Sequence, residues 1–492
     1  MQPMRMQVLR RVFSFPVALA GALLPFAVLN ARSRLNDPDV WWHLKMGQVI
    51  WMTHVIPTTD LFSYTAHNQS IVPQEWLAEV TIYAAYLGGG YSGLMLWLCL
   101  FTTALLCTAY LLCSLYSGNS KVAFPGAMIV WFFAGIALSI RPQLIAYLLL
   151  LAELVAIHLG RTRNPRWFFL LPPLFVLWIN CHGSFILGII VAGVFLFSAF
   201  FNFELGSLVA QPWDARSRKT LLLALTLSLP ALFLNPVGIR QILYPFDTLF
   251  NQHLLMADVE EWAPLKMNSP SGIALLAILL CCFLLPVLRR SVLYWHELLL
   301  LALGTWLAVS HVRLLAAFGI LAAPVVVRQL AAYWDGYDFE KDRILPNAVF
   351  LAASLLVAYL AYPNSNSLQA QVEEQSPVKA VKFLEANGIA GPMLNDYTFG
   401  GYLIWAAPQY PVMIDGRTDL YVWSGFLGEY GNWANLQSDP HLLLDKYKVG
   451  FCLLNSQSPM ARVLSLLPDW KQVYSDDKSV IYMRKTPAES AR

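Results

Sequence analysis

The chain has 492 residues, of which 57% are hydrophobic and 13% are charged, and its mean hydropathy is +0.53. Such a composition excludes an ordinary soluble domain, and the formal net charge of +3 argues against nucleic acid as a partner. Apolar runs of about 16 to 25 residues recur, each long enough for a helix to cross a bilayer core. No alternating barrel pattern appears. The composition therefore predicts a mainly α, polytopic membrane helix bundle.

Taken in chain order, the apolar runs predict eleven transmembrane helices. They lie at residues 13–30, 91–115, 122–140, 142–159, 167–181, 184–203, 220–235, 271–288, 293–310, 312–331 and 346–362. With this count the basic clusters around Arg161, Arg216 and Arg289 fall on the same side as the N-terminus, which the positive-inside rule makes cytoplasmic. Residues 75–88 are then predicted to lie along the membrane surface or to re-enter it. Counting them as a span would move the later basic loops outside.

The polar tail is predicted to be a separate domain. Residues 1–363 would form the membrane domain, with a first outer loop at 31–90, and residues 364–492 a soluble periplasmic α/β domain. In the tail, residues 377–387 predict a helix. Short strands are predicted at GPMLND, YPVMIDG, VGFCLLN, WKQVY and SVIYMR.

Under this topology the polar and titratable residues at helix junctions gather on the outer side. They are Asp37, Asp39, His43, Glu75, Arg141, Asn180, His182, Glu260, Glu261, His311 and Arg313. Titratable groups near the hydrocarbon boundary are costly unless they face protein, water or ligand. The pattern predicts one outward-opening cavity lined by helix ends and loops.

The segment Asn36-Asp37-Pro38-Asp39 follows the first span directly. A carboxylate in a partly dry pocket can act as a general base or hold a divalent cation. Asp39 also precedes an amphipathic helix, so it could instead be the N-cap of that helix. Both roles stay open, and they are compatible. No cofactor other than a divalent metal is predicted, and its ligands would be Asp37 and Asp39.

Three helix junctions supply candidate phosphate ligands. Arg141 and Arg313 carry guanidinium groups that pair with phosphate oxygens, but they could equally extend to lipid headgroups. His182, in the segment Trp178–Phe185, and His311 could donate to phosphate or carry a proton, or could satisfy a polar turn. Asn180 shares the turn of His182. Glu260 and Glu261 could form part of a pocket rim.

Two motifs of the tail favour structural interpretations. Asp415-Gly416-Arg417 is predicted to be a turn with a local ion pair, and Gly400-Gly401 a turn.

These motifs together resemble the GT-C superfamily of integral-membrane glycosyltransferases, to which protein O-mannosyltransferases and aminoarabinose transferases belong. The resemblance rests on the Asp-x-Asp of the first outer loop, the interfacial helix after it, the apolar bundle and the outer tail. NDPDVWWHLKMGQVI, IPTTDLFSYT, PQEWLAEV, the Arg141-Pro142-Gln143 junction, WINCHGSF and the tail block GPMLNDYTFGGYLIWAAPQYPVMIDGR resemble a largely uncharacterised bacterial group within it. The likeness covers nearly the whole chain.

The resemblance implies transfer of a hexosyl or pentosyl group from a polyprenyl-phosphate donor, with inversion at the anomeric carbon. The acceptor would be a glycan, lipid or protein on the periplasmic side of a bacterial cytoplasmic membrane, where the enzyme would serve the cell envelope. Asp37 or Asp39 would be the base. Known members often carry adjacent acids and a His-Pro-Pro-Leu segment, whereas here Pro38 separates the aspartates and Pro73-Gln74-Glu75-Trp76-Leu77 occupies the later position.

Two other functions remain open from the residues alone. A transporter or flippase of a lipid-linked or small polar substrate would also carry polar residues in a bundle, although these usually lie near mid-membrane. A non-catalytic scaffold subunit on the same fold would use the acidic pair structurally. The sugar, the acceptor and the oligomeric state do not follow from the sequence.

Overall fold

The computed structural model describes residues 2–32, 34–135, 137–251 and 262–485. It divides into two compact units. The bundle unit comprises Met1–Arg32, Met95–Pro245 and Ala257–Tyr362, and the loop-tail unit comprises Ser33–Leu94, Phe246–Met256 and Pro363–Arg492. Residues 33–90, assigned above to the outer loop of the membrane domain, and the first residues of the predicted span at 91–115 are thus part of the same compact unit as the tail.

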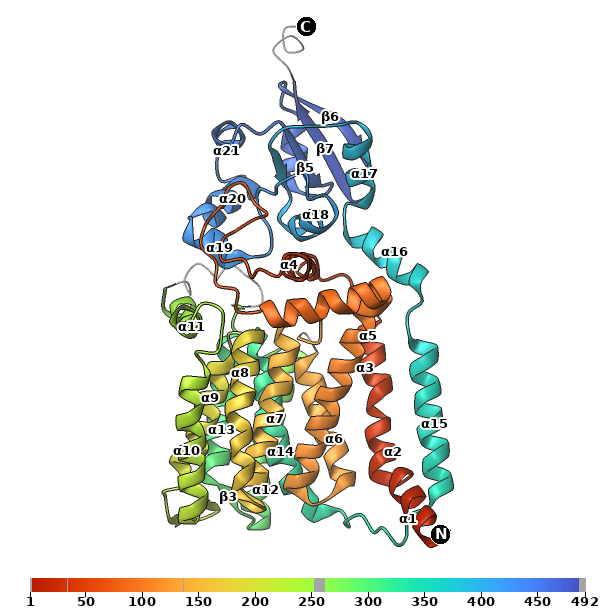
Figure 1. Cartoon of the computed structure of the whole chain (residues 1–492), viewed down its shortest axis with the longest axis vertical. Helices are drawn as coiled ribbons and strands as arrows, with labels where there is room; N and C mark the ends of the chain where they lie inside the picture. Colours follow the sequence, from red (N-terminus) through yellow and green to blue (C-terminus); the bar gives the residue numbers. More distant parts are fainter. Residues whose placement is uncertain (1, 33, 136, 252–261, 486–492) are drawn as a thin grey trace. The chain divides into compact units, whose positions relative to one another are not determined.

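Helices make up almost all of the bundle unit (Figure 1). They are α1 (Gln2–Val12), α2 (Phe15–Gly21), α3 (Leu23–Ala31), the later part of α5 (Trp76–Ser117), α6 (Ser120–Ala134), α7 (Gln143–Thr162), η1 (Pro165–Leu170), α8 (Leu171–Cys181), α9 (Phe185–Ser198), α10 (Ala215–Ala231), α11 (Ile239–Asn251, shared with the other unit), α12 (Pro270–Arg289), α13 (Trp295–Ser310), η4 (Val312–Leu314), α14 (Leu315–Leu330), η5 (Ala331–Tyr333) and α15 (Ile344–Ala361). A small sheet of β1 (Phe203–Leu205), β2 (Leu208–Ala210) and β3 (Leu293–Tyr294), in that order, joins two of the connections.

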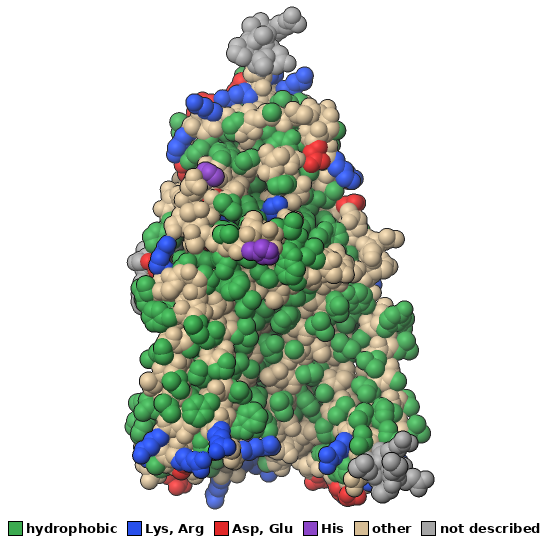
Figure 2. Space-filling model, viewed as in Figure 1, with side chains coloured by type: hydrophobic (Ala, Val, Ile, Leu, Met, Phe, Trp, Pro, Cys, Tyr) green, Lys and Arg blue, Asp and Glu red, His purple; other side chains and the backbone are tan. Residues whose placement is uncertain are grey.

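Helix α14 forms the centre of the bundle, because nearly all of its residues are buried and α6 and α13 pack against it. Glycines allow this close approach. A Cβ on Gly319 would lie 2.8 Å from the Cβ of Phe133, and a Cβ on Gly304 would lie 3.2 Å from the Cα of Phe318. Helices α12 and α15 are mostly exposed and apolar, which suits contact with lipid (Figure 2).

Five helices in the described residues are long and apolar enough to cross a membrane, and Phe15–Ala31, Ser120–Ala134, Phe185–Ser198 and Trp295–Ser310 are shorter apolar segments. Each of the eleven predicted spans corresponds to helical structure, but the number of crossings stays a prediction. Several boundaries differ. Residues 13–30 form two helices interrupted at Ala22, residues 122–140 remain helical only to Ala134, and residues 184–203 only to Ser198.

Basic side chains mark one end of the bundle (Figure 2). The last turn of α7 contributes Arg161, whose Nη1 lies 3.2 Å from Nε2 of His296 at the start of α13. The last turn of α14 contributes Arg328, whose Nε donates to Oε1 of Glu297 at 2.7 Å. This clustering agrees with the predicted sorting of charge, while the orientation in the membrane stays a prediction.

Helices and a four-stranded sheet make up the loop-tail unit. Its elements are α4 (Val40–Thr53), the first part of α5, α16 (Ser365–Gln375), α17 (Val378–Ala386), β4 (Met393–Asn395), η6 (Tyr397–Phe399), α18 (Gly400–Ala406), α19 (Thr418–Trp423), α20 (Phe426–Ala434), α21 (Pro440–Lys446), β5 (Phe451–Asn455), α22 (Pro459–Leu464), β6 (Trp470–Ser475) and β7 (Ser479–Arg484). The sheet order is β4-β5-β7-β6, with β4 and β5 parallel and the other pairs antiparallel. The predicted helix at 377–387 is confirmed, as are four of the five strands.

The prediction of a strand at YPVMIDG is wrong. Val412 makes only an isolated parallel bridge, with Ser63 of the first loop. The backbone N–H of Met413 donates instead to the Asn395 side chain, and Thr65 Oγ1 donates to the Met413 carbonyl. The first loop also supplies Ala66 to the apolar core of the tail. Residues 410–416 are therefore paired with an irregular loop and a side chain, and they do not extend the sheet.

Helix α5 is interrupted at Gly89 and Gly90. Gly90 has φ 57° and ψ −136°, a conformation that favours glycine. A Cβ on Gly93 would lie 1.9 Å from the carbonyl oxygen of Ala85, so the chain turns back tightly on itself here. Residues 76–88 thus form a helix distinct from the apolar span that follows, and their place at the membrane surface stays a prediction.

Candidate functional site

The close crossing of α4 and the first part of α5 creates the main polar cluster of the loop-tail unit. A Cβ on Gly47 would lie 2.2 Å from the carbonyl oxygen of Glu79 and 2.9 Å from the Cβ of Tyr83, so only glycine permits this approach. His43 precedes Gly47 by one helical turn, and Glu75 precedes Glu79 by one turn. The crossing therefore brings His43 against both glutamates.

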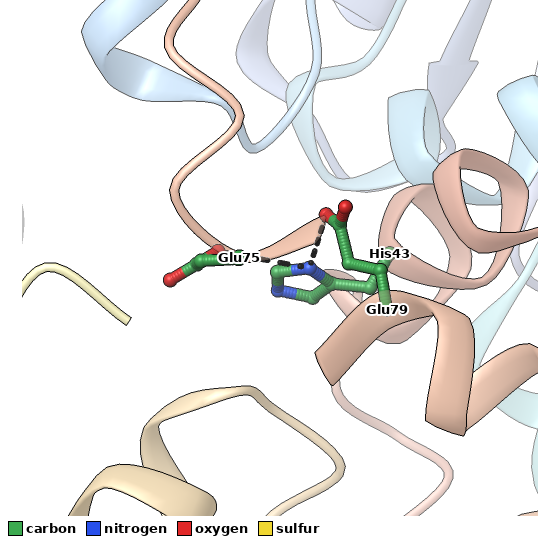
Figure 3. Close-up of side chains that lie close together, drawn as sticks. All are labelled: His43, Glu75 and Glu79. Atoms are coloured by element: carbon green, nitrogen blue, oxygen red, sulfur yellow. Dashed lines mark hydrogen bonds and ion pairs between the residues drawn. The ribbon is translucent and has the colours of Figure 1, made fainter. Parts of the chain in front are cut away.

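His43, Glu75 and Glu79 form a compact buried triad (Figure 3). Nδ1 of His43 lies 3.1 Å from Oε1 of Glu79 and 3.8 Å from Oε2 of Glu75. The side chains of His43 and Glu79 are 4% and 5% exposed, and that of Glu75 is 16% exposed. One ligand atom from each residue lies within 4.8 Å of the others, a spacing that a single metal ion could bridge.

Electrostatics make Glu79 an unusual carboxyl group. Burial raises its pKa well above the ordinary value of 4.5, and the neighbouring Glu75 raises it further, while Arg417 acts in the opposite direction. Two carboxyl groups beside one imidazole favour a bound proton or a bound cation. Imidazole nitrogen with carboxylate oxygens is a donor set that suits zinc, manganese or iron.

The Asp37 and Asp39 loop lies at the start of α4. The backbone N–H of Asp39 donates to Oδ1 of Asp37 at 3.1 Å, and Nε1 of Trp42 donates to Oδ1 of Asp39 at 3.2 Å. Asp39 occupies the N-cap position, but its side chain makes no capping hydrogen bond. The cap interpretation is therefore confirmed in position only, and both carboxylates are half-buried.

A second buried network joins the first loop to the tail. Arg417 donates through Nη1 to Oδ1 of Asp60 at 2.5 Å, and through Nε and Nη2 to Asp415 at 2.8 and 2.7 Å. The hydroxyl of Tyr421 donates to Oδ2 of Asp415 at 2.6 Å. The predicted turn with a local ion pair is confirmed, but its arginine also binds an acid 357 residues away in the sequence.

In the bundle unit, His182 ends α8 with a defined tautomer. The backbone N–H of Ser184 donates to its Nδ1 at 3.0 Å, so in the neutral ring the proton belongs on Nε2. Desolvation by the surrounding protein lowers the pKa of His182 to about 3, and Arg313 acts in the same direction. The imidazole is then a neutral donor. Asn180 donates to the carbonyl of Leu234 at 2.8 Å and fastens this junction to the next turn.

His311 and Arg313 lie between α13 and α14. Nδ1 of His311 is 2.8 Å from the Trp262 carbonyl oxygen, and the Arg313 guanidinium lies 5.7 Å from the Trp262 ring centroid. The Arg313 carbonyl accepts a hydrogen bond from Tyr147, on the helix that begins after Arg141. The junction of Arg313 is thus linked to α7, the helix that follows Arg141.

The predicted site residues separate into two groups. Asp37, Asp39, His43 and Glu75 belong to the loop-tail unit, whereas Arg141, Asn180, His182, His311 and Arg313 belong to the bundle unit. Convergence of the two groups in one cavity stays a prediction. Glu260 and Glu261 lie outside the described residues.

Sequence reasoning missed Glu79, Asp60 and the long-range role of Arg417. The spacing of Glu75 and Glu79, one helical turn apart, was a usable signal for a shared face. Asp60 had no such signal, because only the tertiary structure pairs it with Arg417.

Comparison with known proteins used sequence profiles, curated sequences and solved structures. No family profile matches this sequence, and no curated protein matches it significantly. The oligosaccharyltransferase of Archaeoglobus fulgidus in its apo form is similar with a TM-score of 0.55 and 12% identity, over 96% of this chain and 75% of that one. ArnT from Cupriavidus metallidurans bound to undecaprenyl phosphate is similar with a TM-score of 0.51 and 11% identity, over 95% of this chain and 97% of that one.

Further structures of the archaeal enzyme, AglB, are similar as well. One contains an inhibitory peptide and a dolichol-phosphate, with a TM-score of 0.51 and 11% identity over 94% of this chain and 74% of that one. Another contains zinc and sulfate, with the same score and identity over 94% of this chain and 73% of that one. Both AglB and ArnT are GT-C glycosyltransferases. This chain therefore has the GT-C fold, as the resemblance of its motifs predicted.

Proposed function

We propose that this protein transfers a sugar from a polyprenyl-phosphate donor to an acceptor on the periplasmic side of the membrane, with inversion at the anomeric carbon. The observation that carries the proposal is the likeness of almost the whole chain to ArnT bound to undecaprenyl phosphate. The first loop, which packs against the tail, carries the carboxyl groups that such a transfer requires.

The donor phosphate is assigned to the bundle unit. Arg141, His182, His311 and Arg313 supply guanidinium and imidazole groups at the helix junctions, with Asn180 beside His182. As the sugar bond breaks, negative charge develops on the leaving phosphate, and preorganised donors stabilise it by a few kcal/mol. The Nε2–H of neutral His182 is suited to this task, because Ser184 already satisfies Nδ1.

The acceptor is assigned to the loop-tail unit. Asp37 or Asp39 takes the proton of the acceptor hydroxyl while the acceptor oxygen bonds to the anomeric carbon. On the opposite face the bond to the phosphate oxygen breaks, and its electron pair leaves with the polyprenyl phosphate. This single displacement inverts the anomeric centre. A positioned general base contributes typically 10²- to 10⁴-fold to such a step.

A divalent metal fits His43, Glu75 and Glu79 better than the predicted pair of aspartates. The three residues place their ligand atoms within 4.8 Å of one another, and both His43 and Glu79 are buried. A metal bound there would hold the two helices of the acid loop together and add positive charge beside it. The similar oligosaccharyltransferase structure that contains zinc and sulfate supports this part of the proposal.

The decisive experiment combines mass spectrometry of the co-purified lipid with transfer assays. A polyprenyl-phosphate sugar in the wild-type preparation is the expected finding. Asp39→Asn or Asp37→Asn should then reduce release of polyprenyl phosphate by about 10²- to 10⁴-fold while the protein stays folded. Asp477→Asn, at an exposed position of the tail, is the matched control and should have full activity.

Full activity of the double Asn variant would refute the base assignment. A bound free solute in place of the lipid, with transport into vesicles, would support a transporter instead.

A further inference from the structure

The Asp37-Pro38-Asp39 loop rests on two glycines of the tail. A Cβ on Gly416 would lie 2.1 Å from Oδ1 of Asp39 and 3.5 Å from Nε1 of Trp42. A Cβ on Gly401 would lie 2.4 Å from the Pro38 carbonyl oxygen. Both glycines have ordinary backbone conformations, so any residue could adopt their φ angles. What requires glycine at these positions is the closeness of the loop.

The surface under the loop is itself rigid. A Cβ on Gly400 would lie 2.2 Å from the Ile414 carbonyl oxygen, so one glycine of α18 supports the tail turn and the next supports the acid loop. The turn is fixed from within, because Asp415 accepts hydrogen bonds from Arg417 and Tyr421. Arg417 is fixed in turn by Asp60, and all four side chains are at least nine-tenths buried.

Oδ1 of Asp39 accepts the hydrogen bond of the Trp42 indole N–H, and it also occupies the space that a Cβ on Gly416 would need. Asp37, by contrast, accepts a hydrogen bond from the backbone of its own loop. The Asp39 carboxylate therefore lies against the tail.

We propose that Gly416, Gly401 and the buried Arg417 network are positioning residues that set the orientation of the Asp39 carboxylate. This inference rests on the proposed function in taking Asp39, of the two aspartates, as the base. A displacement of about 1 Å in a reacting group can reduce a rate by about 10²-fold. A methyl group at position 416 should therefore impair transfer even though position 416 is in the tail and touches no assigned substrate group.

The test replaces tryptophan by 5-fluorotryptophan in the full-length protein and measures the ¹⁹F resonance of Trp42 at one constant pH. The chain has 17 tryptophans, and the resonance of interest is the one lost in Trp42→Phe. Because the Trp42 indole donates to Asp39, its shift should report the position of that carboxylate, and Asp39→Asn should move the resonance.

Gly416→Ala is expected to move the Trp42 resonance. It should also lower the release rate of polyprenyl phosphate from the co-purified lipid by roughly 10- to 100-fold. The Michaelis constant for that lipid, when it is added back at varied concentration, should stay unchanged within about two-fold. Gly428→Ala is the matched control. Position 428 lies in α20 of the same tail with open space around it, so both readouts should stay as in the wild type.

If Gly416→Ala does not fold, a milder variant provides the test. Tyr421→Phe removes one hydroxyl from the network and should shift the resonance in the same direction by a smaller amount. An unchanged Trp42 resonance in both variants overturns the proposal. If the resonance moves but Asp39→Asn retains full transfer, the positioning holds and the base assignment of the proposed function fails instead.

Discussion

The loop-tail unit contains two groups of buried carboxyl groups that behave in opposite ways. Burial acts to raise the pKa of Asp415, but the charge and hydrogen bonds of Arg417, with the hydroxyl of Tyr421, hold it below the ordinary 3.8. The pKa of Glu79 is instead raised well above 4.5, by burial and by Glu75. The network around Arg417 is saturated with donors, while the triad of His43, Glu75 and Glu79 has an excess of acid.

This contrast separates a network that holds segments in place from a cluster that can bind a proton or a cation. A saturated ion network holds two segments together and resists change near neutral pH. An acid-rich cluster costs stability when all its carboxyl groups ionise, so it persists where a proton or a cation is to be bound. We therefore expect substitutions in the network to affect folding, and substitutions in the triad to affect the response to protons and metals.

The largest effect is expected for Arg417→Met. Removing the guanidinium leaves Asp60 and Asp415 buried without a counter-charge, which should destabilise the loop-tail unit by about 3–5 kcal/mol. Thermal unfolding of the solubilised protein, followed by tryptophan fluorescence, measures this. Lys446→Met is the control, because its pair with Glu429 is more than half exposed on the lysine side and contributes less than about 1 kcal/mol. Equal decreases of the unfolding temperature in the two variants would contradict the difference between the buried network and the exposed pair.

Metal addition should distinguish the triad from the network. Manganese or zinc at about 100 times its dissociation constant should stabilise the wild type by about 2.7 kcal/mol, seen as a higher unfolding midpoint. His43→Ala should lose this response. His441→Ala, at an exposed histidine of the tail, should keep it. The same gain in both variants would place the ion elsewhere.

Gly47→Ala should disturb the helix crossing that assembles the triad. Its Cβ would meet the Glu79 carbonyl oxygen at 2.2 Å, so the helices must separate. Overpacking of this kind costs about 1–3 kcal/mol, which denaturant unfolding can measure against Gly428→Ala. A stability equal to that of the control would mean that the crossing is not tight.

The smallest effect is expected for Glu79→Gln, and its sign is informative. Because the folded-state pKa of Glu79 is raised, the folded protein binds more protons than the unfolded chain above pH 4.5, and its stability falls as the pH rises through that window. Glutamine cannot ionise, so the substitution removes this loss of stability. The variant should therefore be more stable than the wild type at pH 8, and the difference in stability should shrink toward pH 4.5. A stability difference that is the same at pH 8 and pH 4.5 would contradict the raised pKa of Glu79.

Much of the fold followed from the sequence because lipid-facing helices are apolar over their whole length. The eleven apolar runs all correspond to helices, and Pro142 marks the start of α7 as predicted. The strand at YPVMIDG failed for a physical reason. Its apolar pattern indicates burial, but its hydrogen-bond partners are Phe62, Tyr64 and Asn395, which no local pattern identifies.

The candidate site was predicted only in part. His43 and Glu75 were expected on the outer side. Glu79, one helical turn after Glu75, completes the triad, and Gly47, one turn after His43, allows the two helices to cross closely. The glycines at 401 and 416 were predicted to be parts of turns, whereas Gly401 lies within α18 and both make room for the acid loop. Contacts of this kind depend on the absence of a side chain, and the sequence does not show what occupies the space.

The pairing of Asp60 with Arg417 also constrains the order of biosynthesis. The two residues are 357 positions apart, so the ribosome completes the first loop long before its partner exists. Until then Asp60 lacks its guanidinium partner, and the Asp39 loop lacks the glycines on which it rests. Translation must therefore reach the last quarter of the chain before the acid loop can be completed, and a prematurely terminated product would carry the bundle without an ordered acid loop.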